Sequence, residues 1–290
     1  MQDYIDLHAH SNCSDGKKSV EDIVSMAKQN NVTVLSLSEH YNMSSYKKAR
    51  ALAKSSIEVI PSIEIGTSLE KFGLSKNHVC HLIAYYPSYS ICKILDKYES
   101  SREVCVKKTL KKLQNYVPLS YKSVVRHARD KKSIGRFDIA IALYKEGYCP
   151  DPLSAYGEYL DSGKACFVVR EKEDPVTLIR EILSVGGVPT LVHPKSLKLN
   201  YSDLYDFIKK LKDAGLEGLE VFNPHHNKEQ LSVFDAIAKD LDLVSTVGSD
   251  YHGIVNQDIE IGKGINGNLC INDYDIITEL KRKKHDICLK

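Results

Sequence analysis

The feature that most constrains the fold of this chain is an alternation of short apolar stretches with amphipathic stretches of helical spacing. Val20–Gln29 carries apolar residues at helical spacing, Val32–Leu37 is β-branched and apolar as buried strands are, and Tyr46–Lys54 is helical again. The same pattern predicts strands at Tyr4–Leu7, Ile57–Ile60, Ser62–Ile65, His78–Tyr85, Val188–Val192, Leu219–Phe222 and Leu243–Val247. Strands and helices in this order are typical of a parallel β/α barrel.

Polar side chains stand in or directly after the predicted strands. His8 and His10 follow the first strand, and residues two apart in an extended segment point to the same side, so both can reach one metal ion. Asp15 and Gly16 then favour a turn that brings a carboxylate back to the same place. Because such barrels carry their chemistry at the carboxyl ends of the strands, we expect these groups to converge.

Nine groups of this kind occur along the chain: His8, His10, Asp15, His40, Glu64, His81, His193, Asp250 and His252. Glu64 stands between two isoleucines, where an isolated carboxylate would be costly without a cation or hydrogen-bond donors. Nitrogen and carboxylate ligands without thiolate suit Zn, Mn or Fe. The set predicts a multinuclear metal site.

The charge of this site indicates its substrate. Three divalent ions held by three carboxylates leave a surplus of positive charge, which suits a phosphate ester better than a neutral amide. Such ions also lower the pKa of bound water and hold the phosphoryl oxygens during in-line attack. The residues therefore predict a hydrolase in which hydroxide on the metal attacks phosphorus.

The alternation stops between residues 90 and 165, which are mostly helical in pattern. Residues 100–136 hold eleven Lys or Arg against two acids, Glu103 and Asp130. One interpretation is a solvated helix face; the other is a helical insertion that attracts an anionic substrate. Arg136 beside Gly135 suits bidentate contact with phosphate. We expect a barrel in two parts, 1–89 and 166–290, with an inserted helical cap at 90–165.

The bulk composition limits the classes of protein. The chain has 290 residues and a net charge of +2, so it lacks the overall field that holds long nucleic acid or an anionic membrane. No apolar run approaches ~20 residues, and the polar start is no signal peptide, so we expect a cytoplasmic protein. The eight cysteines form no Cys-x-x-Cys pair and are expected to be reduced.

Several motifs resemble those of the PHP (polymerase and histidinol phosphatase) superfamily of metal-dependent phosphoesterases. They are Asp6-Leu7-His8-Ala9-His10, Ser14-Asp15-Gly16, Glu39-His40, Ile63-Glu64-Ile65, His81, Leu191-Val192-His193-Pro194 and Gly248-Ser249-Asp250-Tyr251-His252-Gly253. Gly186-Gly187-Val188-Pro189, the insertion with Gly135-Arg136, and Asn223-Pro224-x-His226 are similar to the TrpH-like branch.

The resemblance implies a distorted (β/α)7 TIM-like barrel with a helical insertion. It implies hydrolysis of nucleoside 5′-monophosphates or 3′,5′-bisphosphates, with trimming of short 5′-phosphorylated RNA as a related activity. The nine residues would bind two or three Mn, Fe or Zn ions, with Glu64 as a bridging ligand and Asp15, His40 and His252 holding the third ion. Arg136 would orient a phosphate.

The resemblance also bears on the segment around Asn223. His226 or His225 would protonate the leaving oxygen or contact the substrate, and Asn223 would contact it too. The alternative is that Asn-Pro-His-His is simply a capped turn.

Two positions depart from the family pattern. Glu39 stands where Asp is usual before the histidine, so the longer side chain could shift His40 and weaken one ion. Arg136-Phe137-Asp138 replaces Arg-Pro-His, and an acid near a phosphate pocket would repel the substrate. The second departure leaves the substrate open.

Three alternatives remain. A histidinol-phosphate phosphatase belongs to the same superfamily, and the glycine-rich segment before His193 weighs against it. A metal-binding module without turnover is disfavoured because such a module would not need all nine ligands. An exonuclease for long RNA is disfavoured by the near-neutral charge, whereas short oligonucleotides remain open. The oligomeric state is open.

Overall fold

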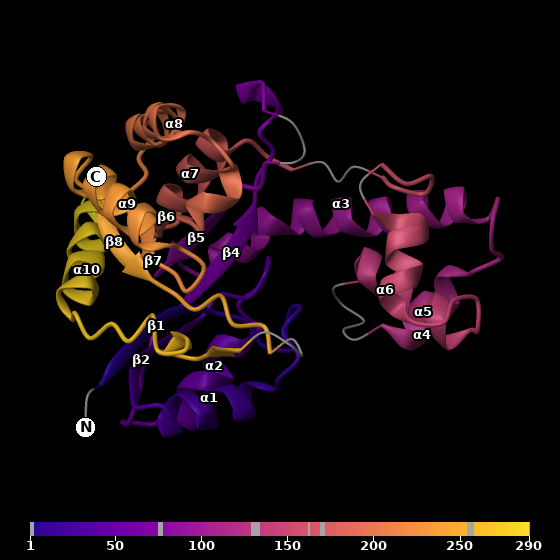
Figure 1. The fold of residues 1–290 in the computed structure, drawn as a ribbon, viewed down its shortest axis with the longest axis horizontal. Helices are drawn as coiled ribbons and strands as arrows, with labels where there is room; N and C mark the ends of the chain where they lie inside the picture. The colour runs from indigo at the N-terminus through magenta and orange to yellow at the C-terminus, as the bar shows by residue number, and fades with distance from the viewer. Residues whose placement is uncertain are drawn as a thin grey trace. The chain divides into compact units, whose positions relative to one another are not determined.

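The computed structural model describes residues 3–74, 78–128, 134–161, 163–168, 172–253 and 258–289, apart from the side chains of 97–102. The chain divides into two compact units. Unit 1 comprises residues 1–94 and 173–290, and unit 2 comprises residues 95–172. Figure 1 shows their elements along the chain.

Unit 1 contains the strands. They are β1 (Tyr4–Ala9), β2 (Val32–Leu37), β3 (Glu58–Val59), β4 (Ser62–Gly66), β5 (His81–Tyr85), β6 (Val188–Val192), β7 (Gly218–Phe222), β8 (Val244–Val247), β9 (Ile259–Glu260) and β10 (Gly264–Ile265). Its helices are α1 (Val20–Gln29), α2 (Ser44–Ala53), α7 (Pro175–Ser184), α8 (Tyr201–Asp213), α9 (Lys228–Asp240) and α10 (Asp275–Cys288), and short 3-10 turns cover Glu70–Phe72 and Pro194–Leu197.

The main strands form two sheets. One is parallel in the order β1-β2-β3, and the other has the order β4-β5-β6-β7-β8. Isolated bridges between Ala9 and Tyr251 and between His40 and Glu64 join the sheets at one edge. The structure is therefore a mixed α/β fold. The hydrogen bonds between the described strands do not close the two sheets into one barrel.

Strand β5 corrects the expectation of uniformly parallel strands. It runs antiparallel to both β4 and β6, and it begins at His81 rather than at residue 78. The register pairs His81 with Gly66 at the end of β4 and with Val192 at the end of β6. The reversed strand thus brings its first residue to the edge where its neighbours bring their last.

Apolar helix faces hold the sheets in place. In α1 the residues Val20, Ile23, Val24 and Ala27 are buried in a cluster that includes Leu35 of β2. Figure 1 shows α1 and α2 beside β1 and β2. The helix starts as its sequence predicts, because Ser19 and Asp22 form a reciprocal capping box. This packing fixes the strand ends on which the polar groups stand.

Unit 2 is mainly helical. Helix α3 (Ser90–Leu113) enters it, followed by α4 (Tyr121–His127), α5 (Arg136–Lys145), α6 (Pro152–Ala155) and a π-helical turn at Tyr156–Leu160. It has a core of its own that includes Leu110, Leu113, Ile139 and Leu143. Among the helices that the structure describes, none combines the length and apolar composition needed to cross a bilayer.

Candidate metal centre

The nine predicted ligands lie together at the edge of unit 1 where the bridges join the sheets. They come from the ends of strands and the segments directly after them, and from the loop before α1: His8, His10, Asp15, His40, Glu64, His81, His193, Asp250 and His252. Three overlapping groups have donor atoms within 4.8 Å of one another: His10-Asp15-His40-His252, His8-His10-Glu64 and Glu64-His81-His193.

Glu64 lies at the centre of the cluster and is 1% exposed. Its Oε2 atom lies 3.1 Å from His10 Nε2, 3.2 Å from His40 Nδ1 and 3.5 Å from His8 Nε2. Its Oε1 atom lies 2.8 Å from His81 Nδ1 and 3.1 Å from His193 Nε2. One carboxylate thus faces five imidazoles from four strands and strand ends, as expected of a bridging ligand.

Two aspartates complete the cluster. Asp15 Oδ1 lies 3.3 Å from His252 Nε2, and Oδ2 lies 3.4 Å from His40 Nε2. Asp250 Oδ1 lies 3.3 Å from His8 Nε2 and 3.4 Å from His10 Nε2. Asp15 is 42% exposed and His252 18% exposed, whereas His8 and His10 are fully buried, so the Asp15 group is the more open one.

The donor set fits divalent metal ions. Buried atoms without a hydrogen-bond partner among the described residues include His8 Nε2, both ring nitrogens of His10, His40 Nδ1 and Glu64 Oε2. Leaving such a group unsatisfied costs ~1–3 kcal/mol each. These atoms approach one another at 3.1–3.5 Å without hydrogen-bond geometry, as ligands around a shared ion do. Metal ions would satisfy all of them.

The pKa shifts show how strongly these charges interact. Burial lowers the pKa of His10, but Asp250 and Glu64 outweigh it and raise the pKa to about 10. Burial lowers the pKa of His40 to about 3 despite the opposing effect of Glu64. Burial raises the pKa of Glu64, yet the surrounding histidines bring it well below its ordinary value. The buried carboxylates thus favour positive charge beside them, whether from protonated histidines or from metal.

Backbone conformation orients two of the predicted ligands, His193 and Asp250. His193 has φ +33° and Asp250 has φ +52°, in the left-handed region that non-glycine residues rarely adopt. His193 follows β6 directly and Asp250 lies three residues after β8, and at both places a left-handed residue turns the chain. Such conformations cost of order 1–3 kcal/mol each and persist where the surroundings fix them.

The buried carboxylate of Asp6 supports the turn before Asp250. Its oxygens accept the backbone N–H groups of Ser249 at 3.0 Å and Gly262 at 2.8 Å. Gly248 is required at this turn, because a Cβ atom there would lie 2.2 Å from His8 Cβ. The turn therefore packs directly on His8.

Glu220 of β7 is a site residue that the sequence reasoning missed. It is fully buried, and its Oε1 lies 2.8 Å from His8 Nδ1. Its Oε2 accepts the His193 backbone N–H at 2.7 Å and the Asn223 side-chain amide at 3.2 Å. With Nδ1–H donating to Glu220, His8 keeps Nε2 free for the cluster. The available signal was the same as for Glu64, a carboxylate between apolar strand residues.

Glu39, the departure from the family pattern, is buried and orders the loop that carries Asp15. Its carboxylate accepts the Ser11 backbone N–H at 3.2 Å and hydrogen bonds from the hydroxyls of Ser11 and Ser14. These contacts with the loop agree with a supporting role and not with direct ligation.

The predicted substrate residues after β7 differ in exposure. Asn223 is 3% exposed. Its side-chain N–H donates to Glu220, and its side-chain oxygen Oδ1 accepts the His225 backbone N–H at 3.0 Å. His225 is exposed. His226 is buried, with Nδ1 2.8 Å from the Val221 carbonyl and Nε2 without a partner among the described residues. Burial lowers the pKa of His226.

Arg136 and Asp138 lie in unit 2 at the start of α5. The Arg136 guanidinium stands 4.6 Å from the centre of the Phe167 ring and donates to the Leu160 carbonyl at 3.4 Å. Asp138 accepts the Gly135 N–H at 2.8 Å. The acid that replaces the family histidine therefore caps its own helix.

Three curated relatives are similar over most of the chain. A 5′-3′ exoribonuclease of Haemophilus influenzae is 29% identical, covering 90% of this chain and 93% of its own. A phosphoribosyl 1,2-cyclic phosphate 1,2-diphosphodiesterase of Eggerthella lenta is 27% identical, covering 86% and 94%. A 3′,5′-nucleoside bisphosphate phosphatase of Chromobacterium violaceum is 22% identical, covering 86% and 87%.

The fold has a solved counterpart as well. A Bifidobacterium adolescentis protein classed as a metal-dependent phosphoesterase superposes with a TM-score of 0.77 at 21% identity, covering 97% of this chain and 96% of its own. The family model described as PHP domain matches residues 6–160, which include six of the nine clustered residues. The chain belongs to the PHP domain family.

Proposed function

We propose that this protein is a metal-dependent hydrolase of nucleotide phosphate monoesters. Its substrates would be nucleoside 3′,5′-bisphosphates or 5′-monophosphates, with hydrolysis of the first phosphodiester bond of short 5′-phosphorylated RNA as a related activity. The observation that carries the proposal is the convergence of nine imidazole and carboxylate groups, with Glu64 at their centre. We further propose that the two sheets correspond to the distorted seven-stranded barrel of the family.

The relatives support this substrate class. The Haemophilus influenzae protein is named for RNA, the Chromobacterium violaceum protein for nucleoside bisphosphates and the Eggerthella lenta protein for a cyclic phosphodiester. All three names describe hydrolysis of a phosphate ester on a ribose-containing molecule. We therefore propose the same bond type and the same kind of molecule as the substrate of this protein.

Within the site we propose two or three Mn, Fe or Zn ions held by the nine residues. When bound, the ions would activate water and neutralise charge on the phosphoryl group. Glu64 would bridge ions, and the more open group at Asp15 would hold the least firmly bound one. Glu220 would keep His8 oriented through its Nδ1.

Two residues outside the cluster are proposed to contact substrate. The lowered pKa of His226 favours a neutral ring whose Nε2 accepts a hydrogen bond over one that protonates the leaving oxygen. Arg136 is kept as a phosphate contact on the strength of the family pattern. The Phe167 ring, whose centre lies 4.6 Å from the guanidinium carbon, would help to hold the guanidinium for a bidentate contact.

The test is hydrolysis by the Mn²⁺-loaded protein of a panel of four compounds, followed as release of inorganic phosphate and, for the RNA, of nucleoside monophosphate. The compounds are adenosine 3′,5′-bisphosphate, AMP, a 5′-phosphorylated RNA dinucleotide and histidinol phosphate. Preferred turnover of the nucleotides is expected. Preference for histidinol phosphate would assign the alternative activity, and metal binding without turnover of any compound would make the protein a binding module.

A further inference from the structure

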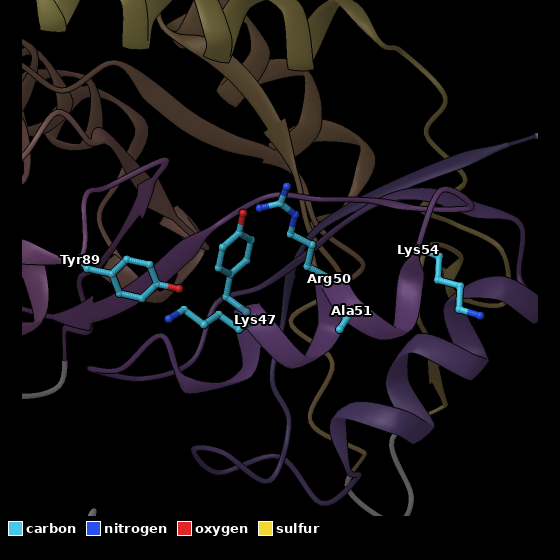
Figure 2. A pocket seen from close by; sticks show the side chains of 6 residues that line it. Lys47, Arg50, Ala51, Lys54 and Tyr89 are labelled. Carbon is cyan, nitrogen blue, oxygen red and sulfur yellow. The ribbon is translucent and has the colours of Figure 1, made fainter.

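A basic groove with aromatic walls lies along α2, within unit 1. Its volume is about 550 Å³, and it is lined by Tyr46, Lys47, Arg50, Ala51, Lys54 and Tyr89. No acidic side chain is among these described lining residues. Figure 2 shows the Lys47 side chain reaching toward Tyr89, Arg50 rising from the middle of the helix and Lys54 pointing away at the far end.

The cations of α2 differ according to the side that they face. Lys48, which does not line the groove, forms an ion pair with Glu21 at 2.6 Å. For Lys47, Arg50 and Lys54 the structure shows no carboxylate partner among the described residues. In a chain with a net charge of only +2, positive charge thus stays uncompensated on the groove side. This arrangement is complementary to phosphate groups.

The aromatic residues supply a second element of recognition. Tyr89 is 49% exposed, and the Lys47 ammonium lies 5.1 Å from the centre of its ring. An exposed tyrosine beside a cation offers a stacking surface for a base next to a contact for its phosphate. A polypeptide partner would need acidic groups here but would gain little from the tyrosine face.

The groove spans several residues of α2, a helix that follows one of the clustered histidines in the chain. Helix α2 begins four residues after His40, which belongs to the metal cluster. Lys47 and Lys54 are seven residues apart, which is about 10 Å along a helix axis. That distance exceeds what a single phosphate group needs.

We propose that this groove binds single-stranded RNA downstream of the 5′ nucleotide that is hydrolysed. The inference rests on the proposed function at the metal centre. A nucleoside bisphosphate has no downstream phosphodiester, whereas an RNA strand does. The groove would therefore favour oligonucleotides over mononucleotides by contacts with phosphate and base that carry little sequence preference.

Lys47→Glu and Lys48→Glu form a matched pair, because the same charge change falls inside and outside the groove. The kcat/KM for a 5′-phosphorylated RNA hexamer is measured against that for adenosine 3′,5′-bisphosphate. We expect Lys47→Glu to lower the ratio of hexamer to bisphosphate about tenfold relative to Lys48→Glu. Each lost phosphate contact should also reduce the slope of log affinity against log salt by about 0.7. Tyr89→Ala should lower the same ratio about tenfold.

An equal ratio in Lys47→Glu and Lys48→Glu would overturn the proposal, as would equal losses on the two substrates. If the wild-type protein cleaves neither substrate, binding of a fluorescein-labelled hexamer decides the matter separately. Binding that Lys47→Glu weakens and Lys48→Glu preserves would keep the groove while rejecting the proposed hydrolysis. No binding of the hexamer by the wild-type protein would reject the groove itself.

Discussion

At the scale of single residues, the centre is made of charged and polar groups, and burying any one of them without its partners would cost free energy. Glu64 and Glu220 are both buried carboxylates on strands, and each is held by histidines that come from other strands. Glu64 faces the shared donors, whereas Glu220 lies behind His8 and His193. The two glutamates therefore have different roles, which mutation can separate.

Removing a ligand should abolish turnover without unfolding the protein. His193→Ala takes one imidazole from Glu64, and Asp250→Ala takes the carboxylate shared by His8 and His10. We expect activity to fall at least 100-fold, with circular dichroism close to wild type. His285→Ala on the exposed face of α10 is the control. Wild-type activity in either ligand variant would refute the assigned centre.

Replacing Glu220 should weaken metal binding although it is not a proposed ligand. Glu220→Gln leaves one acceptor oxygen for three donors, namely His8 Nδ1, the His193 N–H and the Asn223 amide. Loss of such a supporting contact costs ~10–100-fold in metal affinity. Bound metal per chain is measured by atomic emission during titration with Mn²⁺ or Zn²⁺.

The matched control for that variant is Glu217→Gln. Glu217 lies just before β7 and forms ion pairs with Lys212 at 3.2 Å and Lys283 at 2.9 Å, away from the cluster. Its replacement should leave metal content unchanged. If Glu220→Gln binds metal as tightly as Glu217→Gln does, Glu220 is only a packing residue.

At the scale of elements, strand direction and helix caps place the ligands. The reversal of β5 is what brings His81 to the same edge as His193. Helix α7, which leads into β6, is held at its start by Asp174. The Asp174 carboxylate accepts a hydrogen bond from the Thr177 N–H at 3.0 Å and forms an ion pair with Lys71 at 2.6 Å. The cap thereby ties the segment before β6 to the 3-10 turn after β4.

This cap predicts a pH-dependent contribution to stability. Burial raises the pKa of Asp174, but Lys71 and the Thr177 contacts outweigh it and lower the pKa to about 2, from 3.8. The carboxylate therefore stabilises the fold above pH 3.8, and the contribution is lost as the pH falls toward 2. Asp174→Asn should cost about 1 kcal/mol at pH 7 in urea denaturation.

The difference between Asp174→Asn and wild type should shrink as the pH falls from 4 to 2. Lys71→Ala is the comparison, and it should cost less, because Lys71 is 71% exposed and its ion pair is screened by solvent. A difference that stays constant across this pH range would show that the charge of Asp174 does not contribute.

At the scale of the whole molecule, metal binding should be coupled to folding of unit 1. The clustered donors come from β1 through the segment after β8, so an ion bound there ties both sheets together. A ligand at 100 times its Kd stabilises by about 2.7 kcal/mol. We expect Mn²⁺ or Zn²⁺ to raise the Tm of chelator-treated protein by roughly 5–10 °C. His193→Ala should show a smaller shift, and equal shifts would place the metal elsewhere.

Much of the centre could be predicted from the sequence because metal ligation restricts residue types. Only a few side chains bind Zn, Mn or Fe, and a histidine or acid that ends an apolar strand is visible in one sequence. The nine residues from His8 to His252 were found in this way, and they lie together in the structure. The apolar faces of α1 and the other helices follow from spacing alone.

The tertiary structure decided what depends on partners distant in the chain. The direction of β5 depends on its register with β4 and β6, which no local pattern encodes. Glu220 gains its role only when β7 brings it beside His8, 212 residues away in sequence. Likewise, Lys47, Arg50 and Lys54 line a groove only because Tyr89, which lies outside α2, packs beside Lys47. Local sequence thus determined which groups are chemically competent, and long-range packing determined which of them meet.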